Sequence, residues 1–363
     1  MLIRCSRCVM TTTRPDTAFV GGVCSACLSH ETRKGEDWAA RREDLVRLLD
    51  RHHGECLVAS SGGKDSTYIA IVLQAMGANV TTVTATTDDL TALGRQNLDN
   101  LRNLCDGYEV TLNQSVRRKI ARIGLRTVGD ISYAEHVAIW TIPMRMSVAL
   151  RKPLLFYGEC PQAQYGAPLD WDGRQEHTRQ WVAEFGGLNG LRVSDLVGQD
   201  GIKERDLELF RFPPDADLAE VGTTAYYLGS FVPWDSQHNA KVARDHGFRW
   251  NPDVPYPASY WRAENLDNAQ TPLHDYFCFL KYGFGRVTAQ CSADIRAGRL
   301  LRATALDIVT ERDWLPPTHC TGAWLTLILE RIGVSTEEWG TLCDKYANRE
   351  LLEKRDGVWR LKP

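Results

Sequence analysis

The chain has 363 residues, of which 43% are hydrophobic, enough for one medium-sized domain with smaller parts attached. Its net charge of −3 and pI near 6.3 argue against a nucleic-acid groove, because such domains are usually strongly basic. We find no amino-terminal apolar targeting segment and no apolar run of about 18 residues, so we expect a cytoplasmic protein that does not enter a membrane. Without a secretion signal, eleven cysteines favour metal ligands and free thiols over disulfides.

Two Cys-x-x-Cys pairs lie at the start of the sequence. Cys5 and Cys8 form the first pair, Cys24 and Cys27 form the second, and fifteen residues separate the pairs. This is zinc-ribbon spacing, in which each pair presents two thiolates from a tight turn to one tetrahedral ion. Four protein ligands leave no open coordination position, so we expect a structural Zn²⁺ site. An iron–sulfur cluster is the alternative for the same ligand type.

A glycine-rich turn lies between the apolar runs 56–59 and 67–73, an order that predicts strand, turn and helix. The residues of the turn are Ser60, Ser61, Gly62, Gly63, Lys64, Asp65 and Ser66. The glycines let backbone N–H groups approach a polyphosphate, the helix N-terminus adds about half a positive charge, and Lys64 adds a full one. The turn lacks the spacing of the common P-loop. It resembles the Ser-Gly-Gly-x-Asp-Ser signature of the N-type ATP pyrophosphatases, which implies ATP and Mg²⁺.

Strand-like and helix-like segments alternate after this turn. We expect strands at 79–85, 108–112 and 153–157, and helices at 91–104 and at 133–150, the last interrupted near Pro143. The alternation predicts an α/β fold with a doubly wound parallel sheet, which binds ligands at the carboxyl ends of its strands. Three loops should therefore meet in one crevice: the Ser60–Ser66 turn, the loop with Asp88 and Asp89, and the loop 158–161.

The carboxyl-terminal part is helical in pattern from about Trp234. We expect helices at 292–301, 304–312 and 324–332, a capping box of Ser335 and Glu338 that opens a last helix, an extended loop at 250–257, and a short strand at 357–361. We thus divide the chain into a zinc ribbon and linker helix (1–50), a pyrophosphatase domain (51–233) and a mainly helical subdomain (234–363).

Short motifs along nearly the whole chain resemble, in the same order, those of the bacterial N-acetyl sugar amidotransferases. They include Cys5-Ser-Arg-Cys8, Gly22-Val-Cys24-Ser-Ala-Cys27, the turn at Ser61, Tyr157-Gly158-Glu159, Tyr165-Gly166, Phe231-Val-Pro-Trp234, Lys281-Tyr-Gly-Phe-Gly285, Asp294-Ile-Arg-Ala-Gly298 and Asn348-Arg-Glu-Leu351. Such enzymes make acetamidino sugars for surface polysaccharides, such as lipopolysaccharide O-antigen, and for nonulosonic acids. The resemblance implies that ATP adenylates the acetamido oxygen of an N-acetyl sugar, expected to be nucleotide-linked, and that ammonia replaces it, releasing AMP and pyrophosphate.

The resemblance also implies roles for individual residues. The candidate catalytic residues are Lys64, Asp65, Glu159 and Lys281, with Cys160 for the alternative function given below. Glu159 and Lys281 are expected to contact substrate or phosphate, and Asp65 to order the turn or to bind the metal. Asp88 or Asp89 is a candidate contact for the nucleotide or the metal, with a solvated loop pair as the alternative. Arg286 and Arg296 are suited to bind phosphate, with a salt bridge as the equally weighted alternative.

No glutaminase motif is evident in the sequence. The resemblance therefore implies that a separate glutaminase subunit and a cyclase-like barrel supply the ammonia.

Four positions depart from the family pattern. Cys160 stands where we expect asparagine, Gln164 where an acidic residue is usual, and Gln290 and Cys291 near an expected aspartate. The alternative function is therefore an ATP-dependent sulfur transferase with a persulfide on Cys160 or Cys291. Free cysteines are also common small fillers of apolar cores. A nucleotide-binding regulator without catalysis is disfavoured by the intact phosphate-binding turn.

Overall fold

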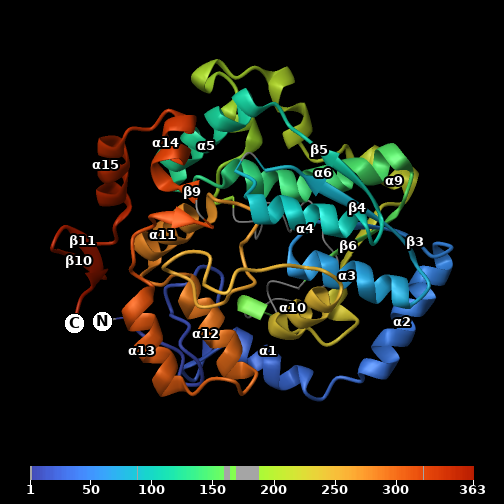
Figure 1. The fold of residues 1–363 in the computed structure, drawn as a ribbon, viewed down its shortest axis with the longest axis horizontal. Helices are drawn as coiled ribbons and strands as arrows, with labels where there is room; N and C mark the ends of the chain where they lie inside the picture. Colours follow the sequence, from blue (N-terminus) through green and yellow to red (C-terminus); the bar gives the residue numbers. More distant parts are fainter. Residues whose placement is uncertain (1, 88, 159–163, 169–187, 322) are drawn as a thin grey trace.

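The computed structural model describes residues 2–87, 89–158, 164–168, 188–321 and 323–363 (Figure 1). Its centre is a five-stranded sheet in the order β5-β4-β3-β6-β7, in which every neighbouring pair is parallel. The strands are β3 (Glu55–Ala59), β4 (Asn79–Ala85), β5 (Asp106–Val110), β6 (Leu154–Tyr157) and β7 (Thr224–Tyr227). The parallel sheet is thus confirmed, although β5 begins two residues before the predicted segment and β7 was not predicted.

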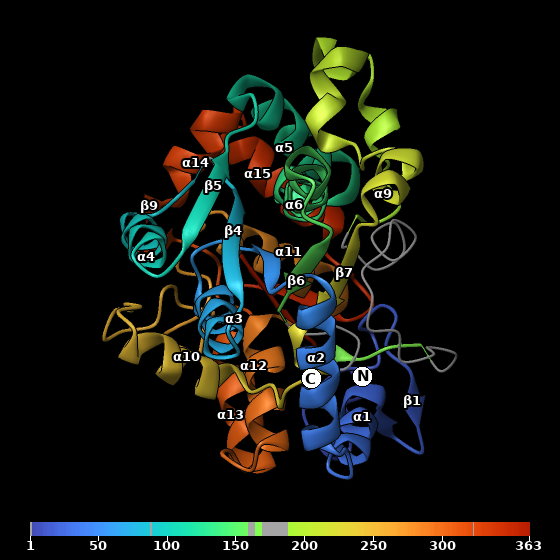
Figure 2. The ribbon, with the colours of Figure 1, turned by 90° about the vertical axis from the view of Figure 1, so that its right-hand side faces the viewer.

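Helices cover both faces of this sheet. They are α2 (Trp38–Arg51), α3 (Lys64–Ala75) and α4 (Ala92–Arg102) on one face, and α5 (Gln114–Val128) and α6 (Tyr133–Leu150) on the other. Because successive side chains of a strand point to opposite faces, Cys56 and Val58 pack in one apolar cluster and Leu57 in the other. Figure 2 shows α3 and α6 on opposite sides of the strands, the doubly wound arrangement expected from the sequence.

The predicted interruption of α6 near Pro143 is wrong. The helix runs through this residue without a break, although proline removes one backbone donor. Its neighbours Ile142 and Met144 are 1% and 3% exposed in the cluster between α6 and the sheet. Packing on both sides therefore holds the helix in place at a position where local propensity alone would favour a break.

The structure describes further elements outside the central sheet and the five helices that cover it. They are β1 (Phe19–Val20), β2 (Val23–Cys24), α1 (Ser25–Arg33), η1 (Val193–Leu196), η2 (Gln199–Gly201), η3 (Glu204–Phe210), α9 (Asp215–Val221), η4 (Leu228–Ser230), α10 (Ser236–Asp245), α11 (Thr271–Tyr282), α12 (Arg286–Arg296), α13 (Arg302–Arg312), β8 (His319–Cys320), β9 (Ala323–Trp324), α14 (Leu325–Ile332), α15 (Thr336–Tyr346), β10 (Leu352–Arg355) and β11 (Val358–Leu361). The carboxyl-terminal part is mainly helical, as predicted.

The predicted helices of this part need one correction. The segment 292–301 is not one helix, because α12 begins after Gly285 and ends before the Ala297-Gly298 turn. The cap of α15 is confirmed: the Ser335 hydroxyl accepts a hydrogen bond from the Glu338 N–H at 3.1 Å. The Glu338 carboxylate, however, accepts from Arg126 of α5 and so ties α15 to the sheet-covering helices.

The amino-terminal segment packs against α12 and α13 (Figure 1). Arg302 of α13 donates to the carbonyl oxygens of Cys8 at 2.9 Å and Cys5 at 3.0 Å. The two chain ends lie close together in both views (Figures 1 and 2).

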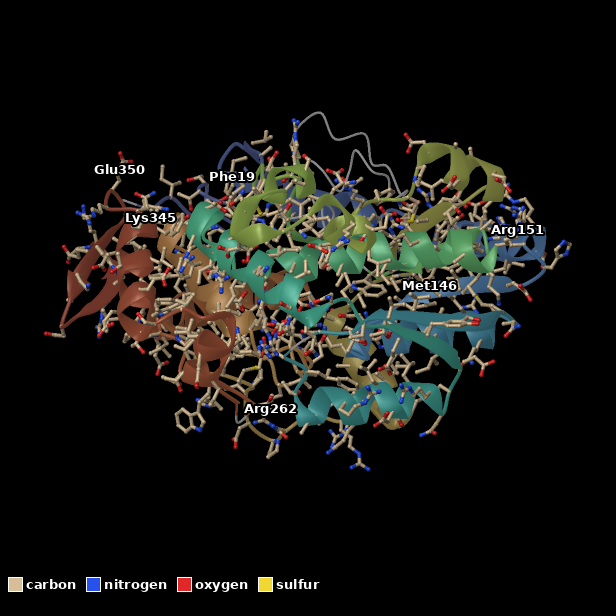
Figure 3. All side chains as sticks on the ribbon, turned by 90° about the horizontal axis from the view of Figure 1, so that it is seen from above. Phe19, Met146, Arg151, Arg262, Lys345 and Glu350 are labelled. Atoms are coloured by element: carbon tan, nitrogen blue, oxygen red, sulfur yellow. The ribbon has the colours of Figure 1, made fainter. Side chains whose placement is uncertain are left out.

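Viewed from above, the molecule is elongated. Arg151, at the end of α6, lies far from Lys345 and Glu350 of the carboxyl-terminal part (Figure 3). Among the described residues, we find no helix whose length and apolar character would let it cross a membrane.

Candidate functional site

A cavity of about 600 Å³ lies at the carboxyl ends of the central strands. Its lining includes Ala59 at the end of β3, Ala85 at the end of β4 and Tyr157 at the end of β6. The chain leaves β3 toward one face of the sheet and enters β6 from the other, so the neighbouring strands β3 and β6 mark the point where the winding reverses. Ligands of doubly wound sheets bind at such a switch point.

The predicted loops meet at this cavity as far as they are described. The Ser60–Ser66 turn, Thr87 and Gly158 all contribute to the lining. Asp88, Glu159 and Cys160 lie outside the described residues.

The Ser60–Ser66 turn is closed by its own hydrogen bonds. The Gly62 N–H donates to the Ser60 hydroxyl at 3.0 Å, and the Ser66 hydroxyl donates to the Gly63 carbonyl at 3.1 Å. Gly63 is the N-cap of α3 and has no side chain to cap the helix amides. The positive end of α3 therefore opens at the turn without a side-chain cap, as an anion-binding helix terminus requires.

Lys64, which is buried, forms an ion pair with the partly exposed Asp65 at the start of α3. The Lys64 ammonium lies 2.6 Å from one carboxylate oxygen of Asp65, and Asn239 of α10 donates to the other at 3.0 Å. Lys64 is 6% exposed, and both charged residues line the cavity. Of the two roles considered for Asp65, this geometry supports ordering of the turn, because both of its oxygens hold neighbouring side chains.

Asp267 is a candidate site residue that sequence reasoning missed. It lines the cavity, and its backbone carbonyl accepts from the Thr91 N–H of the α4 N-cap at 3.0 Å. Burial raises the pKa of the Asp267 carboxyl, against the opposing effects of a hydrogen bond from Ser61 and the charge of Lys64. A single aspartate in an irregular segment carries no sequence pattern; only the fold brings it to the phosphate-binding turn.

Three other predicted site residues differ in whether they line the cavity. Lys281 is not among the residues that line the cavity, and its ammonium donates to the Val128 carbonyl at 3.2 Å. Arg286 does line the cavity and pairs with Asp275 at 2.8 Å. Burial lowers the pKa of Arg286, but the charge of Asp275, its hydrogen bond and the charges of Tyr256 and Glu264 together outweigh this effect, so the net shift is upward. Arg296 donates to the Gln164 carbonyl at 2.7 Å and does not reach the cavity lining.

Gln290 and Cys291 occupy closed positions on α12. The Gln290 carbonyl accepts from the Tyr260 N–H at 2.7 Å, and its amide donates to Glu264 at 2.7 Å. Cys291 is completely buried in an apolar cluster with Val287, and burial raises the pKa of its thiol to about 12. A protonated, enclosed thiol outside the cavity lining is not positioned to carry sulfur to a substrate.

The four amino-terminal cysteines come together as predicted. The sulfur atoms of Cys5, Cys8, Cys24 and Cys27 all lie within 4.8 Å of one another, and those of Cys8 and Cys24 are 3.6 Å apart. Sulfurs bound tetrahedrally to zinc at about 2.3 Å would be about 3.8 Å apart. Backbone N–H groups of Arg7 and Met10 point at the first two sulfurs, at 3.4 and 3.5 Å. The residues therefore fit a structural Zn²⁺ ion held by four thiolates.

The fold and the site define a doubly wound α/β protein with a glycine-rich turn between β3 and α3, a four-cysteine cluster and a helical carboxyl-terminal part. Residues 254–362 match the family model described as "LPS biosynthesis protein WbpG-like, C-terminal domain", and we call this segment the WbpG-like domain after the model that it matches. The match fits the resemblance stated above.

The other comparisons add little. A solved structure titled "Structure of NMN synthetase from Francisella tularensis" is 13% identical, with a TM-score of 0.25, over 60% of this chain and 100% of that chain. A likeness at this level bears on no functional inference. No curated protein matches the chain.

Proposed function

We propose that this protein is an ATP-dependent amidotransferase of lipopolysaccharide biosynthesis, which converts the acetamido group of an N-acetyl sugar to an acetamidino group. One observation carries the proposal: the phosphate-binding turn and the WbpG-like domain line the same cavity. Lys64 and Ser66 come from the turn, whereas Glu264, Asp267 and Arg286 come from the domain. A nucleotide bound at the turn would thus lie beside a second ligand bound by the residues of the domain.

The proposed reaction requires the cavity to hold the charge of the pyrophosphate group, to exclude water and to orient both reactants. The acetamido oxygen attacks the α-phosphorus of MgATP and pyrophosphate leaves; ammonia then adds to the imidate carbon, loses a proton, and AMP departs with the oxygen. The turn amides and Lys64 would hold the charge of the pyrophosphate group. The apolar surfaces of Trp140, Tyr157 and Phe248 in the lining would pack on a sugar or a base and exclude water. Holding both reactants in one cavity lowers the barrier by orientation.

Ammonia would come from a separate glutaminase subunit with a cyclase-like barrel. This part of the proposal rests on the resemblance of the sequence. In the absence of the partner, ammonium salts should support the reaction in its place.

The test is mass spectrometry of products after incubation with MgATP, acetamido sugars in free and nucleotide-linked form, and ammonium or sulfide. We expect a product about 1 Da lighter than the substrate, formed with ammonium and accompanied by AMP and pyrophosphate, because NH replaces oxygen. The variant Lys64→Met should lose this product, whereas Lys241→Met, at an exposed position of α10, should retain it.

Two results would overturn the proposal. A product about 16 Da heavier, formed only with sulfide, would establish sulfur transfer instead, because sulfur replaces oxygen. Absence of pyrophosphate release with every sugar of the panel would remove the amidotransferase assignment.

A further inference from the structure

A second group of metal-ligating side chains lies at the cavity, apart from the four cysteines. Asp130 lies in the turn between α5 and α6, His136 on the first turn of α6, and His274 on α11. One ligand atom from each lies within 4.8 Å of the other two. Both histidines line the cavity, and Asp130 is completely buried behind them. The packing of α11 against α5 in a shared apolar cluster brings the three residues together.

The carboxylate of Asp130 is fixed between the two imidazoles. One oxygen accepts from the Ser132 N–H at 2.8 Å and lies 2.8 Å from His274 Nδ1. The other lies 3.2 Å from His136 Nδ1. This second oxygen and His136 Nδ1 are both buried, and within the described residues neither makes a hydrogen bond of acceptable geometry. Leaving a buried polar atom unsatisfied is energetically costly, so a bound ion that satisfies both atoms at once would stabilise the arrangement.

The charge of Asp130 is a second argument for a bound cation. Within the described chain, the ion-pair partners of Asp130 are the two imidazoles, and no lysine or arginine pairs with it. Glu135, the next acidic residue, pairs with Arg117. The completely buried charge of Asp130 is therefore compensated only when an imidazole is protonated or a cation is bound.

The distances fit a bound cation. Two ligands at right angles around a metal, each about 2.1 Å away, are about 3.0 Å apart. The two oxygen-to-nitrogen distances of Asp130, 2.8 and 3.2 Å, lie on either side of this value. A protonated His136 would instead be expected to direct its N–H at the carboxylate oxygen, and the pair lacks that hydrogen-bond alignment.

We propose that Asp130, His136 and His274 bind a divalent transition-metal ion in the wall of the cavity. Two imidazoles with a carboxylate favour ions such as Zn²⁺, Fe²⁺ or Mn²⁺ over Mg²⁺, which prefers oxygen ligands alone. Three protein ligands leave coordination positions open, as in catalytic sites and unlike the four-cysteine site. The open positions would receive an oxygen donor of the bound substrate, and the metal would act on it as a Lewis acid. Metal binding itself does not depend on the proposed function.

The experiment measures metal stoichiometry of the whole chain by equilibrium dialysis against Zn²⁺ and elemental analysis. The wild type should bind two ions per chain, one at the cysteines and one at this group. The variants His274→Gln and His136→Gln/His274→Gln should bind one. His246→Gln is the matched control, because His246 is exposed and its Nδ1 lies 2.9 Å from the Val242 carbonyl; this variant should bind two ions.

Cobalt spectroscopy of the wild type identifies the site even if a variant misfolds. Co²⁺ added to protein with its cysteine site filled should give weak ligand-field bands without the intense charge-transfer absorption of thiolates, since the ligands are nitrogen and oxygen. The proposal is overturned if the wild type binds a single ion that the histidine variants keep. It is equally overturned if the variants bind two ions like the control. The group would then be an imidazolium–carboxylate network.

Discussion

Replacing Gly62 by alanine tests whether the geometry of the phosphate-binding turn governs nucleotide binding. Gly62 has a φ of +78°, and a Cβ there would lie 2.6 Å from the Leu98 side chain and 2.9 Å from the Leu98 backbone nitrogen. The left-handed conformation costs alanine roughly 1–2 kcal/mol, a factor of about 5–30 in population. Leu98 belongs to α4 and is 3% exposed, so its backbone cannot move aside. The turn must shift instead, and we expect a loss of ATP affinity of roughly 30-fold or more.

The matched control is Gly77→Ala, in the turn between α3 and β4. Gly77 has a φ of +84°, but nothing lies within 4 Å of the added Cβ, so this variant shares the strain without the collision. Calorimetric titration with MgATP and thermal unfolding separate the two effects. Both variants should lose stability, Gly62→Ala the more because it adds the collision to the strain, but only Gly62→Ala should lose affinity. If both bind MgATP as the wild type does, the turn is not the phosphate site.

Three further predictions address other parts of the molecule. Cys291→Ala should leave ammonium-dependent pyrophosphate release unchanged, because the thiol is enclosed outside the cavity lining; a sulfide-dependent product that this variant fails to form would favour the sulfur-transfer alternative. The hydrogen bonds of Arg95 hold the pKa of Glu109 below its usual range. The stabilisation from this pair is therefore present above the unfolded pKa of Glu109 and lost as the pH falls through its folded pKa. In denaturant unfolding, Glu109→Gln should cost about 1 kcal/mol at pH 7 and progressively less as the pH falls through the folded pKa. Cys24→Ser should lower the unfolding temperature and reduce the further effect of a chelator to the part that comes from the proposed histidine site; a chelator response equal to that of the wild type would contradict a metal site at the cysteines.

The parts of the fold that could be predicted are those with local signals. The bounds of β4 match the predicted segment because its β-branched run is bordered by turn residues. The strand, turn and helix around Lys64 follow from two apolar runs and a glycine pair. By contrast, β7 is four residues long and is a strand because it pairs with β6, an interaction that no local pattern records. The start of α12 at Arg286 likewise follows from tertiary packing, since Val287 and Cys291 fit into a buried cluster.

The same distinction explains which site residues could be predicted. The phosphate-binding turn and the cysteine pairs each concentrate their ligands in a short stretch, so spacing alone reveals them. His274 and Asp130 are 144 residues apart and meet only because α11 packs on α5. Asp267 reaches the turn through the contact of its segment with the start of α4. Single charged residues in unrelated segments give no periodic or motif signal, and the structure is needed to bring them together.

The shared core explains why nucleotide and acceptor sites would be coupled in this chain. Ala121 and Leu125 of α5, a helix that covers the sheet, are buried in one cluster with Leu273 of α11 and Leu329 of α14, which lie in the WbpG-like domain. The domain is therefore part of the same packed body as the sheet, although the sequence pattern suggests a separate subdomain. A phosphate-binding turn can hold ATP by itself, but adenylation also requires an acceptor oxygen placed at the α-phosphorus. Since packing of α11 and α14 on α5 fixes the second wall, that core would set the distance between the two reactants.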